Sequence, residues 1–238
     1  MSTVTAELSR DDPRLARPIL TVREAAKALG LPDSTLASWA RGYRTGTGAR
    51  VGPIVTSLES PARHASMPFV GVVEAHVLAA FRRTGVPMQR IRPAVERLRE
   101  ELGLAHALAS SKLFSDGAEI LFDYAEQSGD DTPRDLVVVR SGQRVFAEVV
   151  AAYLERIEFD RRGWPTLLRL PAYRSAQIVI DPRRGFGSPL FERAGVRVED
   201  VLDRWRAGEE MSVLAEDYGL PLGEIEDAAR VAATPIAA

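Results

Sequence analysis

The stretch that decides the fold is LTVREAAKALGLPDSTLASWARGY, residues 20–43. Thr21 stands where its hydroxyl can cap a helix, Glu24 follows three residues later, and Gly30 is placed to end that helix. A second helix is predicted to restart around Pro32. Apolar residues recur at helical spacing in both segments, namely Ala25, Ala26, Leu29, Leu36 and Trp39. The stretch therefore predicts two short helices packed at a steep angle, a helix-turn-helix.

The segment that follows predicts a small hairpin and then a second helical pair. Residues 45–69 are rich in Gly, Ser, Thr and Pro, and a β-favouring patch from Val51 to Leu58 indicates a hairpin or wing. Residues 72–103 then contain two amphipathic helices, which Gly85-Val86-Pro87 separates. The apolar positions of this second pair are Leu78, Phe81, Ile91, Val95, Leu98 and Leu102.

The remaining segments complete a mainly α fold with small β elements (α+β). Residues 1–19 are polar, contain two prolines and predict a flexible arm. Residues 20–159 form a winged helix-turn-helix unit with an α+β extension, whose strands are expected at 113–114, 119–122 and 136–139 and whose helix is expected at 144–156. Pro165 and Pro171 interrupt residues 160–176, which predict an irregular linker. Residues 177–238 form a small domain with helices at 198–207, 211–218 and 222–232.

Charge divides along the chain. Residues 1–110 hold 15 Lys and Arg against 10 Asp and Glu, a net charge of +5, and the other residues hold 16 against 23, a net charge of −7. A polyanionic partner is therefore expected at the N-terminal half, whereas residues 195–238, with four Arg against ten Asp and Glu, would repel phosphate. No signal sequence or apolar run long enough for a membrane helix is present, so we expect a cytoplasmic protein.

Composition and spacing give little support to catalysis. Cysteine is absent, which removes thiolate chemistry and cysteine-based zinc sites. The three histidines, His64, His76 and His106, show no ligand spacing, and the glycines at 185 and 187 do not form a phosphate loop. Acidic residues at 130, 131 and 135 follow the pattern of a solvated surface loop. We expect no enzyme activity, no cofactor and no metal.

Residues 20–102 resemble the MerR-type winged helix-turn-helix, in which a helical pair, a wing and a second helical pair occur in that order. The matching residues are Thr21, Glu24, Ala25, Ala26, Gly30, Thr35, Leu36 and Trp39 in the first pair, and Gly85, Ile91 and Leu98 in the second. Ala37 and Ser38 replace two residues of that family that typically meet the DNA backbone. The resemblance implies DNA binding, and this departure leaves open a scaffold protein that uses its helices for protein contacts.

Residues 177–232 contain the motifs Ile180-Asp181-Pro182, Gly187-Ser188-Pro189, Arg204 to Glu209 and Leu214 to Leu220. With these motifs the segment resembles a short domain of antitoxins that are paired with PIN-domain ribonuclease toxins. Together the two resemblances cover residues 20–232 and look like the long VapB-type antitoxins. They imply a homodimer that binds its own operator and captures a PIN-domain toxin. The alternative is a stand-alone MerR-like regulator with a small-molecule sensor in the α+β section.

Two sets of site residues follow from these expectations. The recognition helix and its surroundings are expected to contact DNA through Asp33, Ser34, Thr35, Ser38, Arg41, Tyr43, Arg44 and Arg50. An antitoxin typically presents arginine to the acidic pocket of its nuclease, and the segment around the linker offers Arg161, Arg162, Arg169 and Arg174. The apolar residues Leu202, Trp205, Leu214, Tyr218, Leu220 and Ile225 are expected to form the core of the C-terminal helices.

Overall fold

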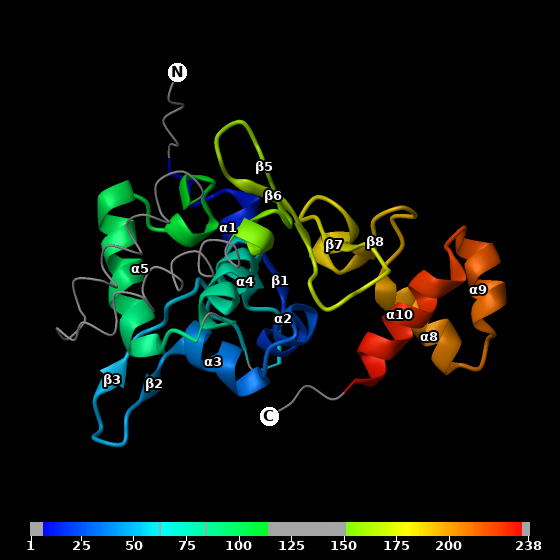
Figure 1. The fold of residues 1–238 in the computed structure, drawn as a ribbon, viewed down its shortest axis with the longest axis horizontal. Coiled ribbons are helices and arrows are strands. Elements are labelled where there is room, and N and C mark those ends of the chain that lie inside the picture. The colour runs from blue at the N-terminus through cyan, green and yellow to red at the C-terminus, as the bar shows by residue number, and fades with distance from the viewer. Residues whose placement is uncertain (1–6, 62, 84, 114–150, 235–238) are drawn as a thin grey trace, which may run out of the picture.

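Helices and small antiparallel sheets follow one another along the molecule. The computed structural model describes residues 7–61, 63–83, 85–113 and 151–234. A helical unit with a protruding hairpin forms one end, a four-stranded sheet occupies the middle, and three helices form the opposite end (Figure 1). The predicted α+β class, mainly helical with small β elements, is confirmed.

The predicted helix-turn-helix is present as α2 (Val22–Leu29) and α3 (Asp33–Arg41). The Thr21 hydroxyl accepts a hydrogen bond from the Glu24 backbone N–H at 3.1 Å, and the Glu24 carboxylate accepts one from the Thr21 N–H at 2.7 Å. Gly30 ends α2 in the left-handed conformation, with φ 66°. The five apolar residues predicted for the interface between these helices are all buried, namely Ala25, Ala26, Leu29, Leu36 and Trp39.

The second helical pair is α4 (Phe69–Arg83) and α5 (Met88–Leu102). Every residue of α4 from Phe69 to Phe81 is buried, so α4 is the central helix of this unit. Strand β1 (Pro18–Leu20) pairs with β4 (Met67–Pro68) just before α4, and the 3₁₀ helix η1 (Ala107–Ala109) is buried against the core that α4 and α5 share.

The hairpin lies earlier in the chain than the sequence predicted. Strand β2 (Tyr43–Arg44) pairs with β3 (Arg50–Val51), so of the patch from Val51 to Leu58 only Val51 belongs to a strand. The β-branched residues Ile54 and Val55 are buried instead, and the backbone N–H groups of both donate to the carbonyl of Trp39 at the end of α3. Ile54 and Val55 are therefore buried beside α3 without forming a strand. Local β propensity does not distinguish this burial from a position in a sheet.

A four-stranded antiparallel sheet runs through the predicted linker. Its strands, in spatial order, are β5 (Ile157–Phe159), β6 (Pro165–Arg169), β7 (Ile178–Ile180) and β8 (Leu190–Phe191). The prediction that residues 160–176 are irregular is therefore wrong for β6. Pro165 is tolerated because it is the first residue of its strand, where a missing N–H interrupts little of the ladder.

The prediction of a flexible arm at residues 1–19 is also wrong for the part of the arm that the structure describes. Helix α1 (Pro13–Ala16) is capped by Asp12, and Leu8 is buried in the core. The Arg14 guanidinium pairs with Asp12 and with Asp160, each at 2.8 Å, and so connects the arm to the turn between β5 and β6. The core that buries Leu8 and the Asp160 carboxylate that pairs with Arg14 are distant in the sequence. The local sequence of the arm therefore gave no indication that it is ordered.

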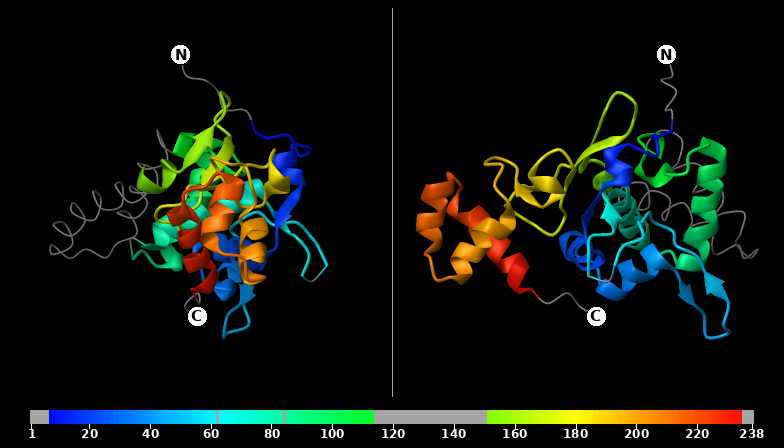
Figure 2. Two further views of the ribbon diagram at one scale, coloured as in Figure 1. Left: turned by 90° about the vertical axis from the view of Figure 1, so that its right-hand side faces the viewer. Right: turned by 180° about the vertical axis from the view of Figure 1, so that it is seen from behind.

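The three predicted C-terminal helices are confirmed as α8 (Val198–Arg206), α9 (Met211–Tyr218) and α10 (Leu222–Ala233), which lie together at one end of the molecule (Figure 2). Their predicted core residues are buried or pack against the core. One Asp227 oxygen accepts backbone N–H bonds from Arg174, Ser175 and Ala176 at 2.7 to 3.0 Å. Burial would raise the pKa of Asp227, but these bonds and the Arg230 guanidinium lower it to about 2.

Of the strand predicted at 113–114, only Leu113 is described, and it is helical rather than extended, so the prediction is wrong at that residue. The strands predicted at 119–122 and 136–139 and the acidic residues at 130, 131 and 135 lie outside the described residues, as does most of the helix predicted at 144–156. Within the latter segment, residues 151–154 are helical, as predicted. Among the helices of the described part of the chain, none combines the length and the apolar character that a membrane span requires.

Helix α4 buries a histidine against the segment that precedes β5. His76 is 1% exposed, and its Nε2 lies 2.9 Å from the carbonyl oxygen of Tyr153. Burial lowers the pKa of His76 from 6.5 to about 4; the hydrogen bond to Tyr153 opposes this shift, and the charges of Arg156 and Arg83 add to it. The folded protein therefore holds His76 neutral in a pH range where the unfolded chain would protonate it.

We predict that the protein loses stability on acidification through this histidine. Between pH 6.5 and 4 the unfolded chain binds more protons than the folded one, so the free energy of unfolding falls as the pH decreases, by up to about 3 kcal/mol. Urea unfolding at pH 7.5, 6, 5 and 4 measures this change. His76→Gln, which removes the titrating group, should flatten the profile in that range, and an equally steep profile in the variant would contradict the assignment.

Candidate nucleic-acid interface

Helix α3 and the β2–β3 hairpin, which we call the wing, are neighbours because Gly42 joins them. Gly42 ends α3 with φ 72° and ψ −177°, a conformation that is essentially restricted to glycine. A Cβ at this position would overlap the carbonyl oxygen of Val51 on the opposite strand. The close approach of the two backbones therefore fixes the direction in which the wing leaves the helix.

The N-terminal end of α3 is open to solvent. Asp33 and Ser34 are exposed, and Thr35 is half-buried one residue later. Asp33 would repel phosphate, but Arg23 of α2 lies 3.6 Å from its carboxylate and offsets that charge. The Ser38 hydroxyl donates to the Thr35 carbonyl at 2.7 Å, so this side chain is turned toward its own helix. The free backbone N–H groups at this helix end favour an anion.

The wing carries a pair of arginines that face each other across its strands. Arg44 is the register partner of Arg50, and both side chains are exposed. Like charges directly opposite in an antiparallel pair destabilise the hairpin. The Arg44 guanidinium reaches the Gly48 carbonyl at 3.4 Å, and neither arginine has a carboxylate partner in the described part of the chain. An anion between the two guanidinium groups would relieve the repulsion, which a phosphate could provide.

Two arginines of α5 that the sequence did not single out hold the base of the wing. The Arg92 guanidinium donates to the Gly52 carbonyl and the Arg99 guanidinium donates to the Ile54 carbonyl, each at 2.8 Å. Arg92 also lies over the Tyr43 ring, 5.8 Å from its centroid. Their spacing of seven residues places both on one face of the helix, but no local signal showed that this face meets the irregular segment after the wing.

These contacts border a shallow pocket beside α3. The pocket has a volume of about 250 Å³ and is lined by Ser38, Trp39, Tyr43, Met88 and Arg92. Tyr43 is 45% exposed, so its ring forms one wall and remains open to solvent. The predicted DNA-binding residues thus divide between two adjoining elements. Asp33, Ser34, Thr35, Ser38 and Arg41 belong to α3, whereas Tyr43, Arg44 and Arg50 belong to the wing.

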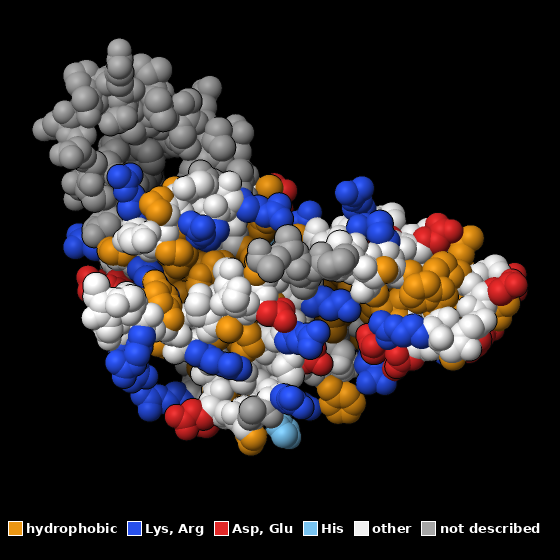
Figure 3. All heavy atoms as spheres, turned by 90° about the horizontal axis from the view of Figure 1, so that it is seen from below, with side chains coloured by type: hydrophobic (Ala, Val, Ile, Leu, Met, Phe, Trp, Pro, Cys, Tyr) orange, Lys and Arg blue, Asp and Glu red, His pale blue; other side chains and the backbone are white. Residues whose placement is uncertain are grey.

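The surface charge agrees with the charge division of the sequence. Figure 3 shows Lys and Arg side chains spread over the N-terminal part of the face that contains the wing. On the C-terminal helices, arginines are held by carboxylates: Arg204 pairs with Glu209 and Asp217, and Arg206 pairs with Glu199 and Asp203. The cations of the wing are therefore available to a polyanion, and those of α8 are largely neutralised by their neighbours.

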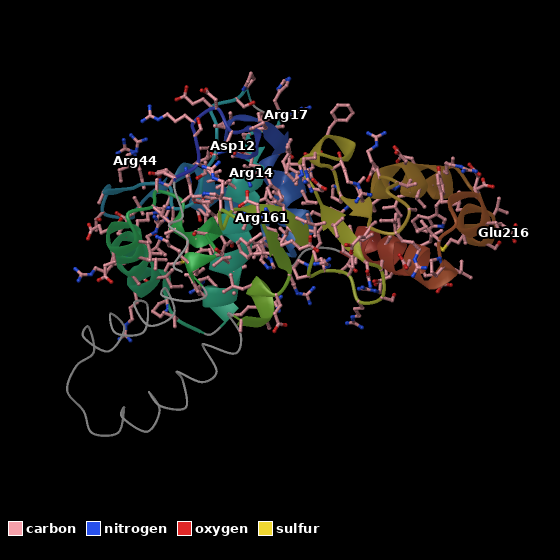
Figure 4. All side chains as sticks on the ribbon, turned by 90° about the horizontal axis from the view of Figure 1, so that it is seen from above. Asp12, Arg14, Arg17, Arg44, Arg161 and Glu216 are labelled. Carbon is pink, nitrogen blue, oxygen red and sulfur yellow. The ribbon has the colours of Figure 1, made fainter. Side chains whose placement is uncertain are left out.

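The four arginines predicted for toxin contact do not form one cluster. Arg161 and Arg162 are exposed in the turn between β5 and β6, and Arg161 lies near Arg14 and Asp12 in Figure 4. Arg169, at the other end of β6, is held by Glu158 at 2.6 Å and Glu192 at 3.0 Å, and these hydrogen bonds raise the pKa of its guanidinium. Arg174 is exposed beside α10.

Family comparisons match both halves of the chain. A family described as "Putative DNA-binding HTH domain" matches residues 18–95, which contain α2, α3 and the wing. A second family, described as "Protein of unknown function (DUF433)", matches residues 178–231, which contain β7, β8 and the C-terminal helices. The first match supports a helix-turn-helix that binds DNA, and the second assigns no activity.

Similar proteins extend over nearly the whole chain. The Mycobacterium tuberculosis protein named "Putative antitoxin VapB45" is 48% identical over 89% of this chain and 92% of its own length. The uncharacterised protein Rv2308 of the same organism is 33% identical over 90% of both chains. The crystal structure of Rv2018 from Mycobacterium tuberculosis has a TM-score of 0.72 and 44% identity, and covers 89% of this chain and 97% of that one.

We predict that Gly42→Ala destabilises the protein by about 1–3 kcal/mol, because alanine disfavours the required backbone conformation and its Cβ would displace the strand of Val51. Urea unfolding measures the loss. Gly46→Ala is the matched control, since Gly46 lies in the loop of the same wing and a Cβ added there would meet no atom within 4 Å. Equal stability of the two variants would contradict a fixed wing.

Proposed function

Because the chain belongs to the family of the Mycobacterium tuberculosis protein named "Putative antitoxin VapB45", we propose that it is the antitoxin of a type II toxin–antitoxin pair. It binds operator DNA through α3 and the wing and neutralises its toxin by direct contact. The observation that carries the proposal is the similarity over nearly the full length of both chains, which includes the helix-turn-helix and the C-terminal domain together. The protein acts by binding and performs no catalysis of its own in this scheme.

The geometry of α3 and the wing supports the DNA-binding part. The exposed N-terminal end of α3 suits entry into a major groove, where Ser34 and Thr35 would meet base edges or phosphates. The wing follows directly and presents Arg44 and Arg50 to the backbone of the same duplex. Arg92 and Arg99 hold the wing in place from behind, so little conformational freedom is lost on binding.

We further propose that a homodimer binds the operator. Helix α3 has nine residues, and one helix of this length reads too few base pairs for a specific site. Two-fold symmetry doubles the contact and predicts a palindromic operator whose half-sites are separated by about one helical turn. Such an operator in the promoter of the protein's own gene would provide the autoregulation that is typical of antitoxins.

The toxin is proposed to be a PIN-domain ribonuclease. The sequence motifs of the C-terminal domain support this class, and a nuclease with a carboxylate-lined site would attract arginine. Of the arginines predicted for this contact, Arg161 and Arg162 have exposed side chains in one turn, whereas Arg169 is already occupied by two carboxylates. Arg161 and Arg162, rather than Arg169, are therefore proposed as one part of the toxin contact.

A second candidate function is a regulator that responds to a small molecule. A cleft of about 440 Å³ lies between α2 and the C-terminal unit, and its lining residues include Leu20, Ala28 and Tyr173 together with the charged Lys27 and Glu199. A ligand in this cleft would touch the helix-turn-helix and α8 together. This function requires no protein partner, which distinguishes it from the antitoxin.

For DNA binding, we predict that Arg44→Ala and Arg50→Ala each weaken affinity for the promoter duplex of the protein's own gene, because each removes a phosphate contact. Each should also lower the slope of log Kd against log salt concentration by about 1. Fluorescence anisotropy from 50 to 200 mM salt measures both effects. Arg206→Ala on α8 is the control, and it should leave the slope unchanged. A wing variant with the slope of the wild type would contradict phosphate contact.

For toxin binding, we predict that this chain and the product of the adjoining gene are captured together from cells that express both. Growth inhibition by that product should be relieved by this chain, and Arg161→Ala with Arg162→Ala should reduce the relief, because the variant loses two exposed charges. Absence of capture and of relief would favour the small-molecule regulator. Full relief by the double variant would leave the antitoxin function intact and exclude this turn from the contact.

A further inference from the structure

The loop between β7 and β8 presents an aromatic ring to solvent. Phe186, in the 3₁₀ helix η3 (Gly185–Gly187), is 75% exposed, more than any other large apolar side chain in the described part of the chain. Exposure of a whole ring is unfavourable in water, so this position is costly unless a partner covers it. The loop also lies beside β1, where Ile19 contacts Gly187, which places it at the junction of the N-terminal unit and the sheet.

The backbone of this loop is held in a conformation that phenylalanine disfavours. Gly185, Phe186 and Gly187 have φ angles of 53°, 57° and 81°, so three consecutive residues are left-handed. Only the central one has a side chain, and strained residues of this kind persist where the surroundings impose them, often at binding sites. The two glycines are required by packing, because a Cβ would come within 2.7 Å of Leu190 at one and of Ile19 at the other.

One arginine lies over the ring, and two more precede it in the sequence. The Arg17 guanidinium lies 5.5 Å from the Phe186 centroid, and Arg183 and Arg184 directly precede the loop. Arg183 is paired with Asp181, but its side chain remains 73% exposed while that carboxylate is buried. Among the described residues, Arg17 and Arg184 are exposed and have no carboxylate within ion-pair distance. Figure 4 shows Arg17 apart from Arg44 of the wing.

We propose that Phe186 and the arginines Arg17, Arg183 and Arg184 form the anchor to which the toxin binds. This inference rests on the proposed antitoxin function and names the surface that it uses. The partner surface that fits is a pocket for an aromatic ring with carboxylates at its rim, since the Phe186 ring is exposed and, among the described residues, Arg17 and Arg184 have no carboxylate partner. Aromatic and arginine side chains dominate the energetic centres of protein interfaces.

The test uses the full chain and the purified product of the adjoining gene. Phe186→Gly should weaken binding by about tenfold or more, because it removes a central anchor side chain. The same variant should keep or raise the melting temperature, since glycine adopts a φ of 57° without strain. A ring with a purely structural role would instead lower the melting temperature on removal. Arg17→Glu should also weaken binding, and Leu222→Ala, at an exposed apolar residue of α10, should not.

The outcomes separate this inference from the proposed function. A wild-type chain that binds the adjoining gene's product while Phe186→Gly binds equally well overturns the anchor and leaves the antitoxin intact. A wild-type chain that does not bind overturns both. If Phe186→Gly lowers affinity for promoter DNA, or changes the oligomeric state in gel filtration, and leaves toxin binding unchanged, the ring contacts nucleic acid or a second copy of the chain and the proposal is wrong.

Discussion

A buried carboxylate on the central helix fixes the path of the chain after the wing, and the DNA-facing geometry depends on it. Glu74 of α4 is fully buried, accepts the Thr56 backbone N–H at 2.6 Å, and lies 3.1 Å from Nδ1 of His106. Gly71, one turn earlier, lets the Thr56 carbonyl approach so closely that a Cβ would overlap it. A buried polar group is tolerated only with such hydrogen-bond partners, so these contacts fix the position of the segment around Thr56. The segment that follows the wing is thereby held against α4.

Carboxylates also hold segments of the chain in place at other junctions of the molecule. Asp160 connects the N-terminal segment to the β5–β6 turn through Arg14, and Asp227 holds the backbone of residues 174–176 against α10. Each links segments that are more than fifty residues apart in the sequence. Single long-range ionic or hydrogen-bonded contacts therefore decide how the helical units are arranged, whereas apolar periodicity decides which helices form.

The difference between local periodicity and long-range contacts explains which features the sequence could predict. The cap of Thr21 and Glu24, the end at Gly30 and the C-terminal helices followed from interactions within a few residues, and the predictions were correct. The arm before Leu20, the strand at Pro165–Arg169 and the exact wing strands depend on distant partners, and those predictions were wrong. The sequence identified Arg44 and Arg50 as cations of the site. That they lie directly opposite each other could be seen only from the pairing register of β2 and β3. Nothing in the sequence indicated that Phe186 is exposed, because only its backbone conformation and its exposure in the structure distinguish it from other phenylalanines.

The wing and the Phe186 loop can be used at the same time. The wing arginines and the Phe186 loop belong to different elements, and Figure 4 shows Arg44 and Arg17 apart on the molecule. A toxin seated on the loop would touch β1, which leads directly into α2, without covering the wing. Toxin binding would then affect operator affinity through the placement of the helix-turn-helix in the dimer rather than by competition for the same residues. Coupling of this kind requires that the toxin bind the DNA-bound and free arrangements with different affinity.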